Sequence, residues 1–257
     1  MLRSGWWKRL LFVGILAGSV AGGRAANAQE TEKNWSLTLQ SDFYGKYVWR
    51  GINVVDDPVW QPSLTFSYAG FSANVWGNLD LTEQNSEKGQ FTEVDLTVSY
   101  AWAWKDLNFS VGAINYQFPN PVAATTTEVY ATVGLATLLS PTLKVYHDID
   151  EVDGTYVALA MAHEFTDVMK LGDGVTVSVD ASGSVGYGSA NYNRFYYGSR
   201  SAALTDALVS IGMPVRIGAR WTIRPSANCS TLLDGSIAGE SNKDTNVWFG
   251  LSLVGSF

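Results

Sequence analysis

The 257-residue sequence lacks the features that stabilise or anchor many proteins. It contains a single cysteine, Cys229, which excludes a disulfide within the chain. Beyond residue 28 no uninterrupted apolar run approaches the ~18 residues that a membrane-spanning helix needs, so a helical membrane protein is excluded. Charged residues make up only 16% of the chain, and their net charge of −7 makes nucleic acid a poor partner.

The first 28 residues have the three parts of a secretory signal peptide. Basic residues come first (Arg3, Lys8, Arg9), an apolar stretch runs from Leu10 to about Val20, and Ala26-Asn27-Ala28 ends the segment. We expect cleavage after Ala28, which leaves residues 29–257 as a single domain. Because residues 1–28 carry four basic residues and no acidic one, the mature net charge is about −11.

The remaining chain is rich in alternation of apolar and polar residues with a period of two, which is typical of β-strands. Val94, Leu96 and Val98, for example, lie on the opposite face of their segment from Glu93 and Asp95. The alternation indicates twelve strands, over residues 35–51, 60–68, 71–81, 91–102, 107–118 (with a bulge near residue 115), 128–138, 142–150, 155–165, 175–187, 203–213, 217–228 and 246–257.

Short and long connections alternate between these strands. The short ones are residues 69–70, 103–106, 139–141 and a turn around Pro214, whereas residues 166–174 form a longer one that fits less well. The long, polar ones include residues 82–90, 119–127, 188–200 and 230–245. A soluble β-sandwich has no reason to place long loops at every second connection. We therefore predict an all-β fold: a single antiparallel up-and-down transmembrane β-barrel of about 12 strands (10–14), with short periplasmic turns and long outer loops.

Aromatic residues fall near the ends of the expected strands, as in the interfacial girdles of membrane barrels. The expected inner girdle contains Tyr68, Tyr100, Trp102 and Phe257, and the expected outer girdle contains Tyr47, Trp49, Trp60 and Phe118. Phe257 also follows a strand with one apolar and one small or polar face, which resembles the signal that barrel-assembly machinery recognises. We expect its deletion to spare export across the inner membrane and to impair insertion.

Charged residues on the polar faces are candidates for a pore lining. Asp42, Lys46 and Arg50 share one face of segment 35–51, and Arg220 and Arg224, with Arg216 at the inner end, share one face of segment 217–228. The last strand between them has a small inward face, so the basic groups would form a wall that sets anion affinity. Glu93 and Asp95 would form an acidic wall elsewhere around the ring. The alternative is that these charges pair with each other and fill a narrow lumen.

Other side chains are candidates for binding or catalysis. Trp76, beside Asn74, Asn78 and Asp80, is a candidate constriction residue or sugar contact. Residues 147–154 (HDIDEVDG) are acidic, but their spacing does not match an EF-hand, and a solvated hairpin loop explains them better. An enzyme of the Ser-His or Cys-His type would have to use His147 or His163, and no Gly-x-Ser-x-Gly motif is present. We therefore expect no catalytic residue, no metal and no cofactor.

The first mature segments also resemble a known family. The stretches SDFYGKYVWRG, QPSLTFSY and ANVWGNLDL, within residues 41–81, are similar to the opening hairpins of TorF-type porins, a bacterial family of outer-membrane barrels. The resemblance implies a porin-like barrel and transfers no catalytic residue.

These observations lead to one main functional prediction and two alternatives. We predict an outer-membrane channel for passive diffusion of small polar or charged solutes, with outer-membrane lipid, the barrel-assembly machinery and a small-molecule solute as partners. The first alternative is a barrel with an adhesive or structural role. The second is a lipid-modifying barrel enzyme.

Overall fold

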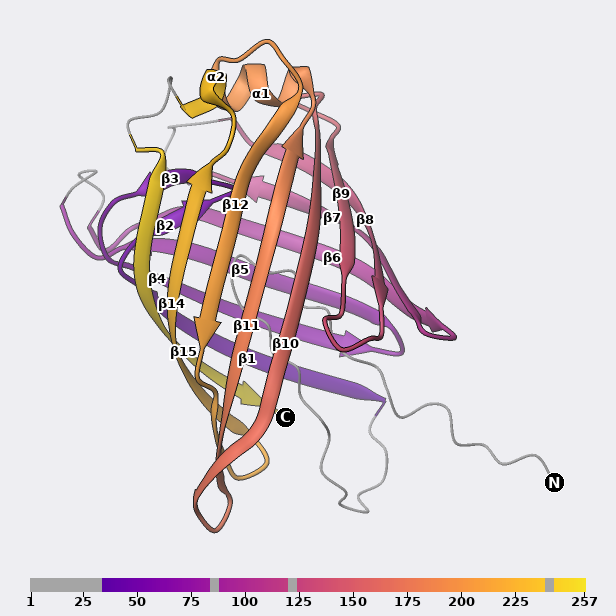
Figure 1. Ribbon diagram of the computed structural model, residues 1–257, viewed down its shortest axis with the longest axis vertical. Helices are drawn as coiled ribbons and strands as arrows, with labels where there is room; N and C mark the ends of the chain where they lie inside the picture. Colours follow the sequence, from indigo (N-terminus) through magenta and orange to yellow (C-terminus); the bar gives the residue numbers. More distant parts are fainter. Residues whose placement is uncertain (1–33, 84–87, 120–123, 239–242) are drawn as a thin grey trace.

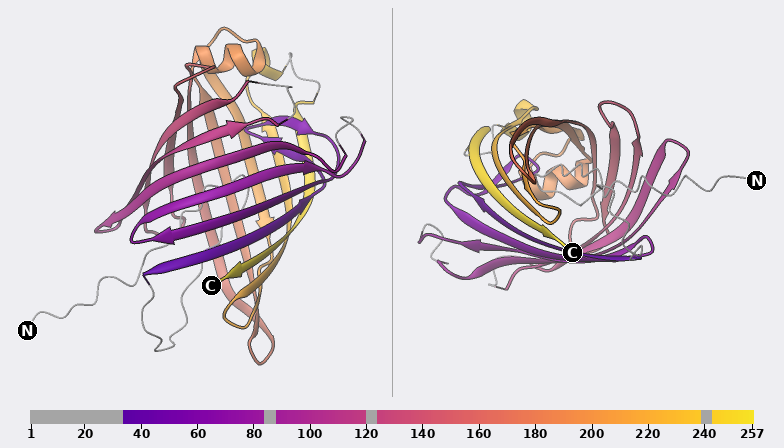
Figure 2. Two further views of the ribbon diagram at one scale, coloured as in Figure 1. Left: turned by 180° about the vertical axis from the view of Figure 1, so that it is seen from behind. Right: turned by 90° about the horizontal axis from the view of Figure 1, so that it is seen from below.

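Twelve antiparallel staves close into a barrel in the computed structural model, which describes residues 34–83, 88–119, 124–238 and 243–257 (Figures 1 and 2). Each stave pairs with its neighbours in the chain, and β1 pairs with β15 to complete the ring. The staves are β1 (Trp35–Tyr44), β4 (Val59–Tyr68), β5 (Phe71–Asp80), β6 (Phe91–Trp104), β7 (Leu107–Gln117), β8 (Thr126–Leu135), β9 (Thr142–Asp148), β10 (Thr155–Gly172), β11 (Val175–Gly188), β12 (Ala203–Gly212) continued by β13 (Val215–Ile217), β14 (Trp221–Leu232) and β15 (Thr245–Ser256). The predicted all-β barrel is therefore confirmed.

The two faces of the wall differ sharply in polarity. Along β15, Phe249 is 71% exposed on the outside, whereas Asn246 and Ser252 are at most 1% exposed and point into the lumen. On β1 the same contrast separates Phe43 from Asp42. The outside is thus an apolar belt and the lumen is lined by small and polar side chains, which suits a wall surrounded by lipid. Among the described residues, no helix is both long and apolar enough to cross a membrane.

Two of the expected turns and one expected bulge were wrong. Residues 166–172 continue β10 rather than forming a loop, because β10 and β11 stay paired past the rim of the barrel to a turn at residues 173–174 (Figure 1). Pro214 interrupts β12 and β13 but does not turn the chain; the turn comes at residues 218–220, so β14 starts later than expected. No bulge occurs near Asn115, because the apolar residues Ile114 and Tyr116 face the lumen in regular register.

The largest departure concerns segment 35–51, which is not one strand. β1 ends at Tyr44, and a second hairpin follows, made of β2 (Tyr47–Trp49) and β3 (Ile52–Val55). Its two turn residues, Arg50 and Gly51, both have positive φ, +46° and +86°, which is the type I′ geometry favoured in two-residue hairpins. We call residues 45–58, which join β1 to β4, the inner hairpin.

The inner hairpin folds into the lumen. Its tip at Gly51 lies against Asp206 and Leu232, where a Cβ on residue 51 would come within 2.8 Å of the Asp206 Cβ. Asp206 belongs to the β12 stave and Leu232 ends β14, so the tip reaches walls other than those from which the hairpin starts. Only a residue without a side chain fits this contact.

Two short helices cap the same end of the barrel, which we call the outer end. They are α1 (Ala190–Tyr197), between β11 and β12, and α2 (Gly235–Ala238), between β14 and β15. The Ser189 hydroxyl caps the first turn of α1 by accepting a hydrogen bond from the Tyr192 amide, and Gly198 ends the helix with φ of +72°. Viewed along the barrel, α1 lies within the ring of staves (Figure 2).

An aromatic and aliphatic cluster fills the outer half of the lumen. It joins wall residues to α1, α2 and the inner hairpin, and its buried members are Tyr156, Ala158, Tyr192, Tyr197, Leu232 and Ile237, with Trp49 and Ile52 packed against them. A second buried cluster holds the stem of the inner hairpin between Tyr44, Val59 and Trp248. The lumen is therefore packed at its outer end and polar below.

Glycines on neighbouring staves make room for the large lumen side chains. A Cβ on Gly186 of β11 would lie 2.3 Å from the Tyr156 hydroxyl and 2.4 Å from an Asp206 carboxylate oxygen. We predict that Gly186→Ala destabilises the refolded barrel by about 1–3 kcal/mol, because buried tyrosine and carboxylate groups must move. Gly183→Ala on the same strand is the control, since its Cβ would meet nothing closer than 3.4 Å. Denaturant unfolding in detergent or lipid measures both, and equal effects would contradict this account.

Candidate functional site: a charged lumen with a hairpin in it

The tip of the inner hairpin places one arginine against the far wall of the barrel. Arg50 donates from Nη1 and Nη2 to the two Glu128 carboxylate oxygens, at 2.8 and 2.7 Å, and only 10% of the Arg50 side chain and 2% of the Glu128 side chain are exposed. The Tyr116 hydroxyl donates to the same carboxylate at 2.8 Å. This is a bidentate, charge-assisted contact with both partners largely removed from water.

Aromatic rings surround the same guanidinium group. The centroids of the Trp49, Tyr146 and Tyr156 rings lie 4.5, 4.5 and 4.4 Å from Arg50 Cζ, and the Tyr192 ring lies at 5.8 Å. Cation–π attraction is significant within about 6 Å and increases when the cation is desolvated. Glu128, Tyr146, Tyr156 and Tyr192 come from β8, β9, β10 and α1, so wall and cap build this site together; we call these four residues the tyrosine–carboxylate cage.

The stem of the inner hairpin is held by a second charged group. Asp56 forms ion pairs with Lys46, at the start of the stem, and with Lys243, from the connection between α2 and β15. Hydrogen bonds from these two lysines hold the pKa of the Asp56 carboxyl well below its usual range. A group whose pKa is lowered by folding keeps its full contribution above its ordinary pKa of 3.8 and loses it only as the pH falls further. The ion pairs of Asp56 with Lys46 and Lys243 are therefore intact at neutral pH.

A third charged group lies on the polar wall of the lumen. Arg224 of β14 reaches over β12 to Asp180 of β11, donating from Nε at 2.8 Å and from Nη2 at 2.6 Å. Gly212 on the intervening stave permits this reach, because a Cβ there would lie 2.4 Å from the arginine Nε. Asp180 and Arg224 are 0% and 4% exposed.

The basic wall expected from the sequence is not assembled as one surface. Lys46 and Arg50 belong to the inner hairpin instead of β1, and Arg216 lies on β13, where it pairs with Glu164 of β10 at 2.6 Å. Arg220 lies in the turn before β14, with its guanidinium 5.8 Å from the Phe257 ring at the inner rim. The expected strand start at residue 217 was wrong, and this error had placed Arg220 in the lumen.

The acidic residues identified from the sequence do face the lumen. Glu93 is 7% exposed on β6 and interacts electrostatically with Tyr47 of the inner hairpin. Asp95 is the next lumen-facing residue of β6, and Asp42 of β1 is 3% exposed. Within the described residues, no salt bridge joins Asp42, Glu93 or Asp95 to a base, whereas Arg50, Arg216 and Arg224 each have a carboxylate partner. Among the described residues that face the lumen, carboxyl groups thus outnumber basic side chains.

Trp76 faces the lumen and packs against the inner hairpin, with its ring 5.7 Å from the Tyr47 ring. Neighbouring polar groups on the same face are hydrogen-bonded to each other, since Asn78 donates to Asp80 at 3.0 Å and accepts from Gln61 at 2.9 Å. Trp76 therefore supports the hairpin from the wall.

The expected aromatic girdles differ in outcome. At the inner end, Tyr68, Tyr100, Trp102 and Phe257 are all 38–54% exposed on the outside, as expected for an interfacial belt. At the outer end, Trp60 stacks on Phe43 on the outer face. Tyr47, Trp49 and Phe118 were placed wrongly: all three pack into lumen clusters, because the chain around them turns inward.

The two histidines and the cysteine lie outside the lumen sites. His163 packs against Phe165 on the outer wall and hydrogen-bonds to the Leu138 carbonyl, while His147 hydrogen-bonds to Thr155 and lies 3.8 Å from Asp153. Cys229 is an exposed free thiol. No group of three or more His, Cys, Asp or Glu residues that could hold a metal ion occurs in the described part of the chain.

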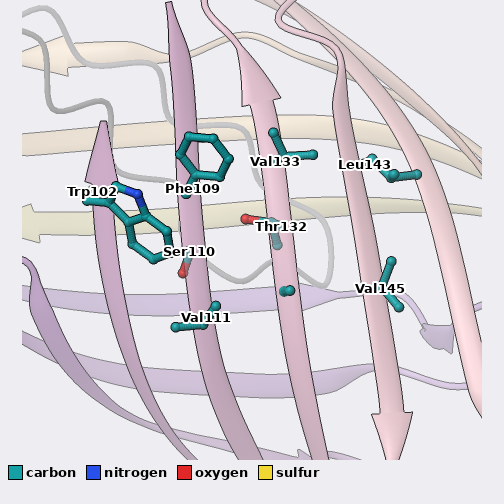
Figure 3. A pocket seen from close by; sticks show the side chains of 9 residues that line it. Trp102, Phe109, Ser110, Val111, Thr132, Val133, Leu143 and Val145 are labelled. Atoms are coloured by element: carbon teal, nitrogen blue, oxygen red, sulfur yellow. The ribbon is translucent and has the colours of Figure 1, made fainter. Parts of the chain in front are cut away.

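A hollow of about 200 Å³ lies between β6, β7, β8 and β9, but on the lipid-facing side (Figure 3). Its lining is mostly apolar, with Trp102, Phe109, Val111, Val133, Leu143 and Val145. Val111 and Leu143 are more than 40% exposed on the outside of the barrel. This hollow suits lipid acyl chains and does not belong to the lumen.

The closed ring, the apolar belt and the polar, charged lumen define a transmembrane β-barrel of the bacterial outer membrane. The chain belongs to the family described as "Bacterial protein of unknown function (Gcw_chp)", whose model matches residues 28–218. No curated protein matches the sequence significantly.

Three solved structures, a porin, an outer membrane channel and an outer membrane secretin, are similar to this chain at low sequence identity. A NanC porin is 11% identical, covers 84% of this chain and 98% of its own, and gives a TM-score of 0.49. An outer membrane channel from Pseudomonas putida F1 is 8% identical, with coverages of 90% and 100% and a TM-score of 0.49. A bacterial polysaccharide outer membrane secretin is 6% identical, with coverages of 89% and 100% and a TM-score of 0.47.

Several residues of the site were not identified from the sequence. Glu128 and Asp180 occupy lumen-facing positions within the expected strands 128–138 and 175–187, so the alternation could have identified them as inward-facing. Their partners could not be found this way, because Arg50 is 78 residues from Glu128 and Arg224 is 44 residues from Asp180. The tyrosines of the cage lie in the expected strands 142–150 and 155–165 and in the connection 188–200. No helix was predicted in this connection.

The Asp180–Arg224 pair gives a direct test of this lumen geometry. We predict that Asp180→Asn destabilises the refolded barrel by about 3–5 kcal/mol, because the buried arginine loses its partner. The double variant Asp180→Leu/Arg224→Met should recover most of this loss, since neither charge remains. Denaturant unfolding measures both, with the exposed turn variant Asp173→Asn as the charge-loss control. A double variant no more stable than Asp180→Asn would contradict the pairing.

Proposed function

We propose that the protein is an outer-membrane channel for passive diffusion of small polar solutes, with a preference for cations. The observation that carries this proposal is the polar lumen, in which the arginines are paired and several carboxylates are not. Rings or walls of one charge sign are a common basis of selectivity in pores. The anion affinity expected from the sequence is not retained, because Arg224 and Arg50 are neutralised by partners.

The inner hairpin sets the size of solute in this proposal. It packs into the outer half of the lumen. In the proposed channel, ions therefore pass through the space beside the hairpin, or through the space that opens when the hairpin moves. A twelve-stave barrel is intermediate between filled eight-stranded barrels and wide porins, and a hairpin inside it narrows the passage further. We therefore propose small conductance steps and exclusion of large solutes. The resemblance of residues 41–81 to TorF-type porins agrees with this proposal.

Two other functions compete with a channel. A purely structural or adhesive barrel is favoured by the packed outer half of the lumen, and it would conduct no ions. An enzyme is less favoured, because in the described part of the chain the side-chain contacts of His147 and His163 include no serine or cysteine. We accordingly propose a channel with no catalytic residue.

Targeting and assembly complete the proposal. The signal-peptide segment, residues 1–28, lies outside the described residues, and we retain export with cleavage after Ala28 as a proposal. Phe257 continues the pairing of β15 with β1 through two backbone hydrogen bonds to Leu37, and its ring packs on Trp221 at 5.8 Å. We propose that it serves both rim packing and recognition by the barrel-assembly machinery, in a membrane whose lipids contact the apolar belt.

The lumen carboxylates provide the test of ion preference. In planar bilayers under a KCl gradient, we predict discrete conductance steps. The reversal potential should be shifted towards the equilibrium potential of K⁺, as expected for a cation-selective pore. The double variant Glu93→Gln/Asp95→Asn should lower the cation-to-anion permeability ratio roughly twofold or more, because two lumen groups that can carry negative charge are removed. Glu151→Gln, an exposed outer-loop change, is the matched control and should leave the ratio unchanged. Absence of any conductance would favour the structural barrel, and an unchanged ratio in the double variant would contradict the assigned selectivity.

A further inference from the structure

We propose that the tyrosine–carboxylate cage is a binding site for the guanidinium group of a solute, and that Arg50 occupies it as an intramolecular ligand. This proposal deepens the proposed channel function, and rests on it for its biological role, by naming guanidinium-bearing solutes as the class that the lumen recognises.

The cage is built by residues that do not belong to the inner hairpin. Glu128 supplies a carboxylate that accepts hydrogen bonds from Nη1 and Nη2 of the guanidinium group, and Tyr146, Tyr156 and Tyr192 supply rings within 5.8 Å of the guanidinium carbon. Trp49 is the one ring contributed by the hairpin itself. Without the Arg50 side chain, a desolvated carboxylate and three tyrosine rings would remain around an empty space of guanidinium size.

Contacts that do not involve Arg50 hold the cage in place. The Tyr116 hydroxyl donates to Glu128 at 2.8 Å, and the Tyr156 hydroxyl donates to Asp206 at 3.0 Å. The rings also pack on each other, with centroids 6.3 Å apart for Tyr146 and Tyr156 and 5.3 Å apart for Tyr156 and Tyr192. A site organised by its own contacts binds a ligand with little cost of rearrangement.

The occupant sits in a backbone position that does not suit it. Arg50 has φ of +46° at the first turn position of a type I′ hairpin, where Gly, Asn or Asp is usual because a Cβ is unfavourable there. Glycine or asparagine would make the same turn without this strain. The presence of arginine at this position is therefore explained by its guanidinium group, which forms two hydrogen bonds with the cage and packs between its rings.

Methylguanidinium binding to the variant Arg50→Gly tests the proposal. Glycine keeps the turn conformation and empties the cage. By isothermal titration calorimetry in detergent, we expect saturable one-to-one binding with a Kd of about 1 mM. The wild type should bind at least about twofold more weakly, because the tethered Arg50 competes at an effective concentration in the millimolar range or above, which is equal to or greater than this Kd. Methylammonium, which cannot form the bidentate contact, should bind more weakly than methylguanidinium.

Arg50→Gly/Glu128→Gln is the matched control and should show no saturable binding, because it lacks the carboxylate. A folded Arg50→Gly barrel that does not bind methylguanidinium, or binds it equally well without Glu128, would overturn the proposal. Arg50→Asn, which also tolerates positive φ, replaces Arg50→Gly if the latter does not fold; if neither forms a barrel, Arg50 is a structural residue and the proposal is wrong. The titration tests guanidinium binding without any ion flow, whereas the bilayer recordings test the channel. A failure of the binding proposal can therefore be distinguished from a failure of the channel proposal.

Discussion

The closed ring of backbone hydrogen bonds is the constraint from which the rest of this structure follows. In the bilayer core no water satisfies a free N–H or C=O group, so every strand must pair on both sides and the sheet must have no open edge. The pairings of β1 with β15 and of β10 with β11 meet this requirement. Once the ring is closed, alternate residues of each stave must point to lipid or to the lumen, and the chain's polar side chains are collected inside.

The arrangement of the lumen then depends on which partners these inward-facing polar side chains find for their charges and hydrogen bonds. Arginines reach carboxylates on staves that are not their neighbours, as Arg224 does over β12, where Gly212 permits the reach. The inner hairpin completes the filling, since Arg50 joins the hairpin tip to Glu128 on β8. In the proposed channel, ions would have to pass the inner hairpin, so its position would govern their passage more than the charge of any single wall residue.

The parts of the fold that depend on local alternation were predicted well from the sequence. The barrel class, the number of staves and the inward direction of Asp42, Glu93 and Asp95 all follow from the period of two. The inner hairpin was missed because residues 45–51 continue the alternation of β1 in phase; only the Arg-Gly pair at positions 50 and 51 marks the turn, and an arginine is not a usual sign of positive φ. The ion pairs were missed for a different reason, since they join residues far apart in the chain through the ring's curvature.

The central claim is that the inner hairpin controls passage through the barrel, and removing it tests that claim most directly. Tyr44 and Val59 are directly paired across β1 and β4, so a two-residue Asn-Gly turn can replace residues 45–58 without changing the wall. Single-channel recording in planar bilayers should then show a conductance several-fold larger than that of the wild type, with the fold verified by circular dichroism and heat-modifiable gel mobility. A folded barrel whose conductance equals that of the wild type, or that still conducts nothing, would contradict the claim.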